Sequence, residues 1–399
     1  MPDPDVWDVI VIGAGPAGSS TARIAAESGA RVLLLDRARF PRYKTCGGGI
    51  TGFSLRAMPD AARATFEAEI TDFGLSRKGA DRVMLHADEP FLGMVQRESF
   101  DQVLVDEAVS AGAVFRDGVT VRGLEESDGV VTVRLEDSTL HARVVVGADG
   151  SSGRTAGYVG VEFAGTDLGL EIELAAPDHE WAATALFDWG ADRGAYAWLF
   201  PKRDTLTIGV IQRTGLPNAT RAYLELWLQQ LGLASATRVR ESGHLTRWRS
   251  RRSPLRRGSV LVAGEAAGLL EPWTREGISF ALRSGVMAGA AAASAASAHD
   301  LLSRNTALDG YVAAVTRDLA PQIQSGAAML TVLERSPALL HRVLAHTTVG
   351  RRTFLALCRG SVRIGALVDN PLIRAGAAVL NPGRVVSPAR APRGAAPAS

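Results

Sequence analysis

The stretch that decides the fold is Val6-Trp-Asp-Val-Ile-Val-Ile-Gly-Ala-Gly-Pro-Ala-Gly18. Its first part is rich in β-branched side chains, which is typical of a strand buried on both faces in a parallel sheet. In the turn that follows, Gly13 allows a tight bend, Gly15 lets the backbone approach a pyrophosphate, and Gly18 permits close packing of a helix on the strand. The N-terminus of that helix supplies free amide N–H groups and a positive dipole end for phosphates.

A second predicted strand, residues 31–35, ends at Asp36. This carboxylate lies roughly 20 residues past the glycines, where it can accept hydrogen bonds from a ribose hydroxyl. Strand, glycine turn, helix, strand and acid therefore fall in the order of a dinucleotide-binding unit. We predict that the chain holds an adenine dinucleotide.

Two more short strands end at glycine-rich turns further along the chain. Val144–Val146 leads into Gly147-Ala-Asp-Gly150, and Val260–Ala263 leads into Gly264-Glu-Ala-Ala-Gly268. These turns resemble two motifs of the flavin hydroxylase and reductase superfamily, and the resemblance implies that the dinucleotide is FAD. In that superfamily the first motif lies near the pyrophosphate and is also linked to nicotinamide cofactor use. The second places a carboxylate on the ribityl chain and a helix N-terminus toward the flavin pyrimidine.

The same resemblance assigns Arg97 to the position of an arginine that starts a helix beside the cofactor; the other interpretation is a solvated helix cap. Two positions depart from the superfamily, since Glu265 replaces the usual Asp and Arg275 the usual Gly. Glu265 keeps the acceptor oxygens, whereas Arg275 adds bulk and charge near the expected flavin edge. The resemblance assigns to the cofactor Gly13, Gly15, Pro16, Ala17, Gly18, Asp36, Arg37, Lys44, Cys46, Gly47, Gly48, Gly49, Arg97, Val121, Asp149, Gly264, Glu265, Pro272, Gly277 and Ile278.

The segment Lys44-Thr-Cys-Gly-Gly-Gly49 carries three consecutive glycines, which let the backbone pass very close to a planar ring or a phosphate. It resembles the Cys-Gly-Gly segment of the geranylgeranyl reductase family, FAD enzymes that reduce carbon–carbon double bonds in isoprenoid chains. In that family the segment covers the isoalloxazine and its cysteine lies in the active site. Alkene reduction needs a proton on one carbon when hydride arrives on the other. Our hypothesis is that Cys46 donates that proton or positions its donor; otherwise it is a small buried residue under the loop.

The segment Tyr196-Ala-Trp-Leu-Phe-Pro-Lys202 alternates like a strand, so that Tyr196, Trp198 and Phe200 point to one face. It matches the reductase family pattern Tyr-x-Trp-x-Phe-Pro-Lys at every specified position. Such a face suits an apolar tunnel for a polyprenyl chain lying against the flavin, although it can also be a core strand. We expect the flavin ring between this strand and the triglycine turn, with Cys46, Tyr196 and Trp198 as catalytic candidates. Lys202 either contacts a polar head group or caps the strand.

The composition is that of a globular protein long enough for two or three structural units, with 399 residues and a net charge of +2. This charge gives no reason to expect nucleic acid as a partner. The two cysteines, Cys46 and Cys358, are far apart, which argues against a disulfide framework and fits a reducing cytosol. We expect no signal peptide and no membrane-spanning helix. The alanine-rich residues 286–298 predict a helix packed tightly on the sheet through small side chains.

The expected fold is of the α/β class, with three parts. A Rossmann-like FAD-binding domain of the glutathione-reductase type is assembled from residues 1–75, 96–155 and 255–325. An antiparallel β-sheet substrate domain takes residues 76–95 and 156–254, because strand-like runs there lie between turn residues. Residues 326–380 form a C-terminal helical domain, and residues 381–399 a disordered tail.

The expected C-terminal helices carry an excess of arginine. Basic amphipathic helices can lie on anionic membrane surfaces, but the same pattern also fits the solvated face of a packed helical domain. We expect a cytoplasmic enzyme that contacts the inner membrane face peripherally. The charged residues concerned are Arg335, Arg342, Arg351, Arg352, Arg359, Arg363, Arg374 and the single acid Asp369.

The sequence thus favours an FAD-dependent reductase that saturates the double bonds of a geranylgeranyl or polyprenyl chain by hydride transfer from reduced flavin. The flavin would be reduced by NAD(P)H or a reduced electron carrier. One alternative is an FAD-dependent monooxygenase or halogenase of an aromatic or polyketide substrate, because it shares the nucleotide motifs and halogenases carry a related Trp-x-Ile-Pro strand. A second is a flavoprotein that only carries electrons or binds a lipid without turnover. The Cys-Gly-Gly segment and the Phe-Pro-Lys ending favour the reductase.

Overall fold

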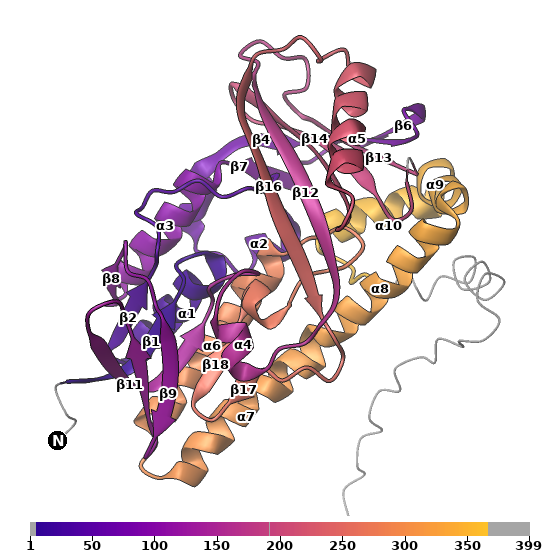
Figure 1. The fold of residues 1–399 in the computed structure, drawn as a ribbon. Coiled ribbons are helices and arrows are strands. Elements are labelled where there is room, and N and C mark those ends of the chain that lie inside the picture. The colour runs from indigo at the N-terminus through magenta and orange to yellow at the C-terminus, as the bar shows by residue number, and fades with distance from the viewer. Residues whose placement is uncertain (1–4, 191, 366–399) are drawn as a thin grey trace, which may run out of the picture.

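Three β-sheets organise the computed structural model, which describes residues 5–190 and 192–365. One sheet has eight strands, one has seven, and a small one has three. Figure 1 shows the long strands β12 (Phe163–Ala175) and β16 (Arg238–Arg249) extending away from the eight-stranded sheet toward α5 (Pro217–Gln230). The predicted tail, and the part of the predicted helical domain beyond residue 365, lie outside the described residues.

The eight-stranded sheet carries the nucleotide motifs. Its main path has the order β17-β18-β11-β1-β2-β8, and β18, β11, β1, β2 and β8 pair in parallel. The three motif-bearing strands lie side by side, so their carboxyl ends bring the glycine turns to one edge of the sheet. The bounds are β1 (Val6–Ile12), β2 (Val32–Leu35), β8 (Val114–Arg116), β9 (Gly123–Ser127), β10 (Val130–Arg134), β11 (Thr139–Gly147), β17 (Arg256–Arg257) and β18 (Val260–Val262).

Helix α6 (Ile278–Ser297) packs directly on α1 (Pro16–Glu27). A methyl group on Gly285 would lie 2.3 Å from the Ala17 carbonyl oxygen, so only glycine lets the two helix backbones approach this closely. The predicted helix is therefore present, but its small side chains pack mainly on α1 rather than on the sheet. Helix α6 has the length and the mean hydropathy, 1.2, of a membrane-crossing helix, and 72% of that stretch is buried inside the fold. Core helices of this kind pass the same test.

The seven-stranded sheet has the order β16-β12-β15-β14-β13-β5-β6 and is antiparallel except where β13 pairs with β5. One face is covered by α5, whose Tyr223, Leu224 and Trp227 pack on it. The other face is turned toward the triglycine turn. The remaining bounds are β5 (Asp72–Arg77), β6 (Ala80–His86), β13 (Thr184–Trp189), β14 (Tyr196–Pro201) and β15 (Thr205–Arg213), and the small sheet consists of β3 (Gly49–Ile50), β7 (Leu92–Val95) and β4 (Phe66–Ile70).

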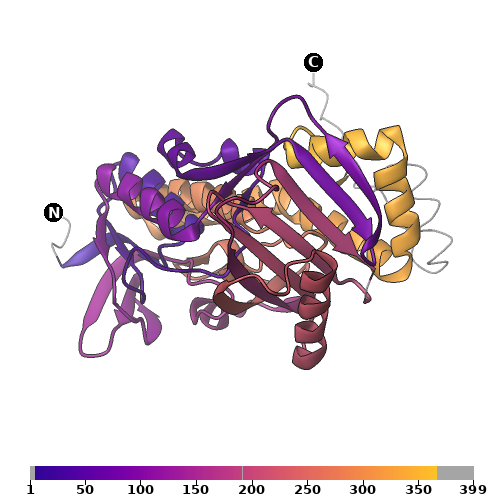
Figure 2. The ribbon, with the colours of Figure 1, turned by 90° about the horizontal axis from the view of Figure 1, so that it is seen from above.

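The C-terminal helices close the remaining side of the molecule. In Figure 2 the helices drawn in yellow lie beside β5 and β6, at the edge of the seven-stranded sheet. These helices carry Phe354 and Leu357 toward the cavity described below. The helix bounds not yet given are α2 (Gly52–Leu55), α3 (Arg97–Ser110), α4 (Thr155–Val159), α7 (Leu301–Asp318), α8 (Ala320–Arg335), α9 (Pro337–His346) and α10 (Thr348–Cys358).

Candidate active site

A cavity of about 790 Å³ is lined by the glycine turns, the seven-stranded sheet and the C-terminal helices. Nearly all of the residues singled out from the sequence line it, although they come from segments far apart in the chain. The exceptions are Gly18, Gly264 and Pro272. A methyl group on Gly18 would lie 1.7 Å from the Gly13 carbonyl oxygen, and Pro272 packs on Gly326, so these residues shape the walls from behind.

Asp36 fixes the shape of the nucleotide end. One carboxylate oxygen accepts a hydrogen bond from the Ala14 amide at 2.7 Å, and the other accepts one from the Ala38 amide at 2.8 Å. This ties the glycine turn to the end of β2. Because a carboxylate offers about four lone-pair sites, the oxygens can still accept further hydrogen bonds from a ribose.

Two arginines share one buried carboxylate beside the glycine turn. Asp101 is fully buried and accepts hydrogen bonds from Arg97 Nε at 2.8 Å and Nη2 at 2.7 Å, while Arg42 Nη2 lies 2.8 Å away. Arg97 is itself 9% exposed, so it is not a solvated cap. The set keeps one net positive charge. Arg42 Nη1 is buried and has no hydrogen-bond partner among the described residues. Arg42 Nη2 would lie 3.5 Å from a methyl group on Gly15, so the guanidinium is close to the glycine turn.

Arg42 was missed from the sequence. It shows no motif of its own and lies just before the triglycine segment. Arg42 offers an unpaired N–H donor, the set of two arginines and Asp101 carries a net positive charge, and Gly15 has no side chain to block the backbone. These features together suit the pyrophosphate of a dinucleotide. The nucleotide end of the cavity therefore fits FAD.

Glu265 points into the cavity from the turn after β18, and His244 of β16 holds it with an Nε2–Oε2 distance of 3.1 Å. Burial by itself raises the pKa of Glu265, but the His244 hydrogen bond and the charges of Lys44 and Arg97 outweigh it and bring that pKa to about 2. The carboxylate is thus ionised at neutral pH. His244, which the sequence did not single out, stabilises the longer side chain that replaces the usual Asp.

Arg275 is turned aside into a buried ion pair. Its Nε and Nη2 donate to Asp167 Oδ2 at 2.9 and 2.6 Å, and its Nη1 donates to the Trp273 carbonyl at 2.7 Å. The side chains of Arg275 and Asp167 are only 3% and 1% exposed. The charge that departs from the superfamily is therefore neutralised, although Arg275 still contributes to the cavity wall.

The triglycine turn and the aromatic strand touch each other. A methyl group on Gly47 would lie 2.6 Å from the Phe200 ring and 3.2 Å from Trp198 Nε1. Tyr196, Trp198 and Phe200 do share one face, and all line the cavity. Because the turn packs directly on Phe200, there is no slot for a flavin ring between them at this point. The expectation of a sandwiched ring is wrong in that detail, and turn and strand form one continuous wall.

Cys46 lies in this wall. Its amide donates to Glu171 Oε1 at 3.3 Å, and its sulfur accepts a hydrogen bond from the Gly48 amide at 3.4 Å. The sulfur also interacts with the Arg97 guanidinium. Glu171, another residue missed from the sequence, is buried and lines the cavity from β12. Lys202 is buried as well, and its Nζ donates to the Thr207 hydroxyl behind the wall.

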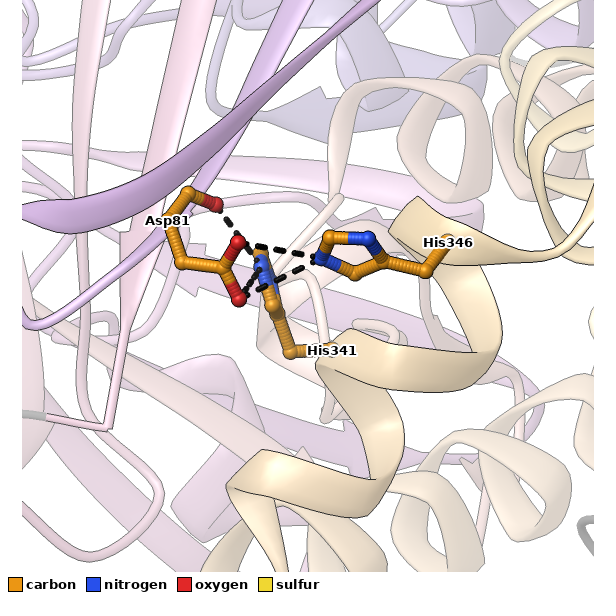
Figure 3. Close-up of side chains that lie close together, drawn as sticks. All are labelled: Asp81, His341 and His346. Carbon is orange, nitrogen blue, oxygen red and sulfur yellow. Dashed lines mark hydrogen bonds and ion pairs between the residues drawn. The ribbon is translucent and has the colours of Figure 1, made fainter.

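A second cluster of potential ligands lies away from the cavity (Figure 3). His341 Nε2 lies 2.9 Å from the Asp81 carbonyl oxygen, and His346 Nε2 lies 3.1 Å from Asp81 Oδ1. A metal on His341 Nε2 would force the proton onto Nδ1, and Nδ1 is buried without a partner among the described residues. The hydrogen bonds alone account for the cluster, which fastens α9 to β6.

Comparison with known proteins places the chain in a class. The family model described as FAD binding domain matches residues 6–302, and the chain belongs to this family. Among its relatives is the geranylgeranyl diphosphate reductase of Rhodobacter capsulatus, 30% identical over 72% of this chain and 75% of the relative. The digeranylgeranylglycerophospholipid reductase of Methanocaldococcus jannaschii is 29% identical over 74% of this chain and 79% of its own. Within the FAD-binding class, this chain is a member of the geranylgeranyl reductase family of FAD-dependent oxidoreductases, and FAD is its cofactor.

Solved structures share the fold more widely. A geranylgeranyl bacteriochlorophyll reductase-like protein from Thermoplasma acidophilum matches with a TM-score of 0.76 at 19% identity, over 95% of this chain and 97% of the other. A flavin-dependent brominase matches with a TM-score of 0.69, also at 19% identity, over 89% and 93%. At such identities the likeness shows the fold alone. The choice between reductase and halogenase therefore depends on the sequence relatives and on the site.

Proposed function

We propose that this protein is an FAD-dependent reductase that saturates carbon–carbon double bonds in a geranylgeranyl or polyprenyl chain. One observation carries the proposal: the thiol-bearing turn and the aromatic strand form a continuous wall of the cavity that begins at the dinucleotide motifs. The names of the sequence relatives support the same substrate class.

The apolar end of the cavity suits an isoprenoid. Phe73, Phe187 and Phe354 line it, with Phe73 in edge contact with the other two rings at centroid distances of 5.0 Å. Leu357 of α10 and Ile364 in the turn that follows it continue this surface. Packing an apolar chain against these side chains excludes water and fixes the position of a double bond, and positioning matters because an unactivated alkene has no carbonyl to stabilise charge.

The chain's own residues would hold the cofactor by the contacts described above. Arg42 and Arg97 would hold the pyrophosphate, Asp36 would hold the ribose, and Glu265 with His244 would hold the ribityl chain. Bound and reduced, FAD supplies a hydride to the alkene. Cys46 lies in the wall where a proton is needed on the second carbon. This proposal includes three further assignments. The FAD-binding domain is of the glutathione-reductase type, it is assembled from the three segments given above, and its flavin is reduced by NAD(P)H or an electron carrier.

Membrane contact is proposed from the charge of the C-terminal helices. Arg342, Arg351, Arg352 and Arg359 are exposed on α9, α10 and the turn after α10. Exposed Val349 lies among them. A surface of this kind would let a cytoplasmic enzyme take a lipidic substrate from the inner membrane face.

Anaerobic reoxidation tests the function. The flavin is reduced with dithionite, geranylgeranyl diphosphate or a prenyl quinone is added without oxygen, and absorbance and product mass are followed. The reductase predicts flavin reoxidation and a mass gain of two hydrogens for each saturated bond. Reoxidation that needs oxygen, and yields a hydroxylated or halogenated product, would instead establish the monooxygenase or halogenase. Full flavin loading with neither result would leave an electron carrier.

A further inference from the structure

Glu171 is the acidic side chain with an unsatisfied oxygen in the cavity wall. It lies on β12, is 2% exposed and lines the cavity next to the triglycine turn. Its Oε1 accepts hydrogen bonds from the Tyr43 hydroxyl at 3.0 Å and from the Cys46 amide at 3.3 Å. Its Oε2 is buried and has no hydrogen-bond partner within the described residues.

An ionised carboxylate would be poorly stabilised in this environment, because buried charges are normally paired and fully hydrogen-bonded. The charge of Lys202 opposes this effect, but its Nζ is hydrogen-bonded to Thr207, and no ion pair links it to Glu171. Burial raises the pKa of Glu171, with Lys202 and the two hydrogen bonds opposing this. The charged and titratable groups facing Glu171 or its partner Tyr43 are Tyr43, Cys46, Glu173, Lys202 and Arg240.

The position of Glu171 in the sheet brings it next to the aromatic wall. Glu171 pairs with Gly209 of β15, and Gly209 pairs in turn with Trp198 of β14. A methyl group on Gly209 would lie 2.1 Å from the Trp198 ring, so the indole lies across the glycine. The carboxyl group and the indole are therefore neighbours on the same face of the sheet.

We propose that Glu171, held by Tyr43 and by the Cys46 backbone, is the acid that delivers the proton to the alkene. This inference rests on the proposed function and revises the hypothesis that the Cys46 thiol is the donor. The step breaks the O–H bond of the carboxylic acid, the π bond of the alkene and the bond that holds the hydride in the reduced cofactor, which is thereby oxidised, and it forms two C–H bonds. The electron pair arrives with the hydride from the reduced cofactor, and Glu171 is left as a carboxylate.

A path for reprotonation is present in the structure. The Tyr43 hydroxyl, which donates to Glu171 Oε1, lies 2.7 Å from the hydroxyl of Ser242. Tyr43 and Ser242 are only partly buried. A proton can therefore pass from solvent through Ser242 and Tyr43 to Oε1, and a half-turn of the carboxyl group then exchanges its two oxygens.

The test compares E171Q with E173Q. Glutamine keeps an acceptor for Tyr43 and Cys46 but has no acidic proton. Glu173 is buried on the same face of β12 two residues on and does not line the cavity, which makes E173Q a matched control. We expect E171Q to bind FAD and to be reduced by dithionite normally, but to reoxidise with geranylgeranyl diphosphate about 100- to 10,000-fold more slowly in a single turnover. E171D should recover part of the rate.

Two readouts separate this inference from the proposed function. Infrared spectroscopy of the FAD-loaded enzyme at neutral pH, without substrate, should show a protonated carboxyl band that shifts in D₂O and is absent from E171Q. The single-turnover rate of wild type should also show a solvent deuterium effect that E171Q changes. If wild type lacks the band, or if the E171Q rate lies within threefold of wild type, the role of Glu171 is refuted while the proposed function stands. A wild-type enzyme that no isoprenoid reoxidises would refute the proposed function and the inference with it.

Discussion

Replacing Asp167 with Asn should destabilise the protein by about 3 kcal/mol. The substitution removes the carboxylate that neutralises Arg275 while leaving the guanidinium buried, and breaking one side of a buried ion pair costs about 3–5 kcal/mol. The lower figure applies because Arg275 keeps its hydrogen bonds to the carbonyls of Trp273 and Gly194.

The reciprocal substitution R275G restores the glycine usual in the superfamily, yet it should also destabilise the protein. Arg275 adopts a left-handed φ of 56°, and glycine relieves about 1 kcal/mol of strain there. The Asp167 carboxylate would then be buried alone, and its Oδ1 has no partner within the described residues even now. The net loss should be about 2–3 kcal/mol. The double variant D167N/R275G leaves neither of these charges buried. Its loss of unfolding free energy should therefore be about 2 kcal/mol smaller than the summed losses of the two single variants.

The assay is urea unfolding followed by tryptophan fluorescence, with FAD at the same excess for every variant because ligand binding shifts stability. E136Q breaks an exposed ion pair with Arg122 and serves as the control, with an expected change below about 1 kcal/mol. If the loss of unfolding free energy in the double variant equals the sum of the two single losses, the reasoning is refuted, because the two charges would then not compensate each other.

Two further predictions concern the cavity wall and the hydrogen bonds between α9 and β6. G47A forces a methyl group within 2.6 Å of the Phe200 ring, whereas at Gly49 the same group meets the ring at 3.6 Å. G47A should therefore lower the free energy of unfolding by about 1–3 kcal/mol and lower turnover, and G49A should lower the free energy of unfolding by less than about 1 kcal/mol. Urea midpoints and single-turnover reoxidation measure this, and equal effects would contradict the contact. Burial lowers the pKa of His341 from its usual 6.5 although Asp81 opposes it, so the unfolded chain binds the proton better and stability should fall as pH drops below 6.5. H341Q should remove that part of the pH dependence of the thermal midpoint, and a profile unchanged by H341Q would contradict it.

Local patterns predicted much of the nucleotide end, because its signals are contiguous in sequence. The glycine turn, the helix after it and Asp36 lie within one βαβ unit whose geometry is set by short connections. Arg42 and His244 were missed because nothing near them in the sequence marks their role. His244 meets Glu265 only through the pairing of β16 with β12, which brings a separate part of the chain to the cavity.

Contacts between distant segments also explain what local patterns left out. The charge of Arg275 was expected near the flavin edge, but the partner that neutralises it, Asp167, lies 108 residues earlier in the chain, and no local signal links them. The flavin was expected between the triglycine turn and the aromatic strand. Glycine at position 47 does permit a close approach, as predicted, but the ring that approaches is that of Phe200. A permissive backbone shows that something comes close without showing what it is.

The alternation of β12 connects these features. Asp167, Gly169 and Glu171 lie on one face of this strand because side chains alternate every second residue. Asp167 neutralises Arg275, Gly169 leaves space in the cavity wall, and Glu171 presents its free oxygen beside the aromatic strand. A shift of register by one residue would turn all three to the opposite face of the sheet at once. Glu171 pairs with Gly209, and the Trp198 ring occupies the space that a side chain at position 209 would fill. This contact helps to hold that register. The ion pair that accommodates Arg275 and the acid proposed for the reaction are thus set by the same strand, and a substitution that loosens β12 should damage both together.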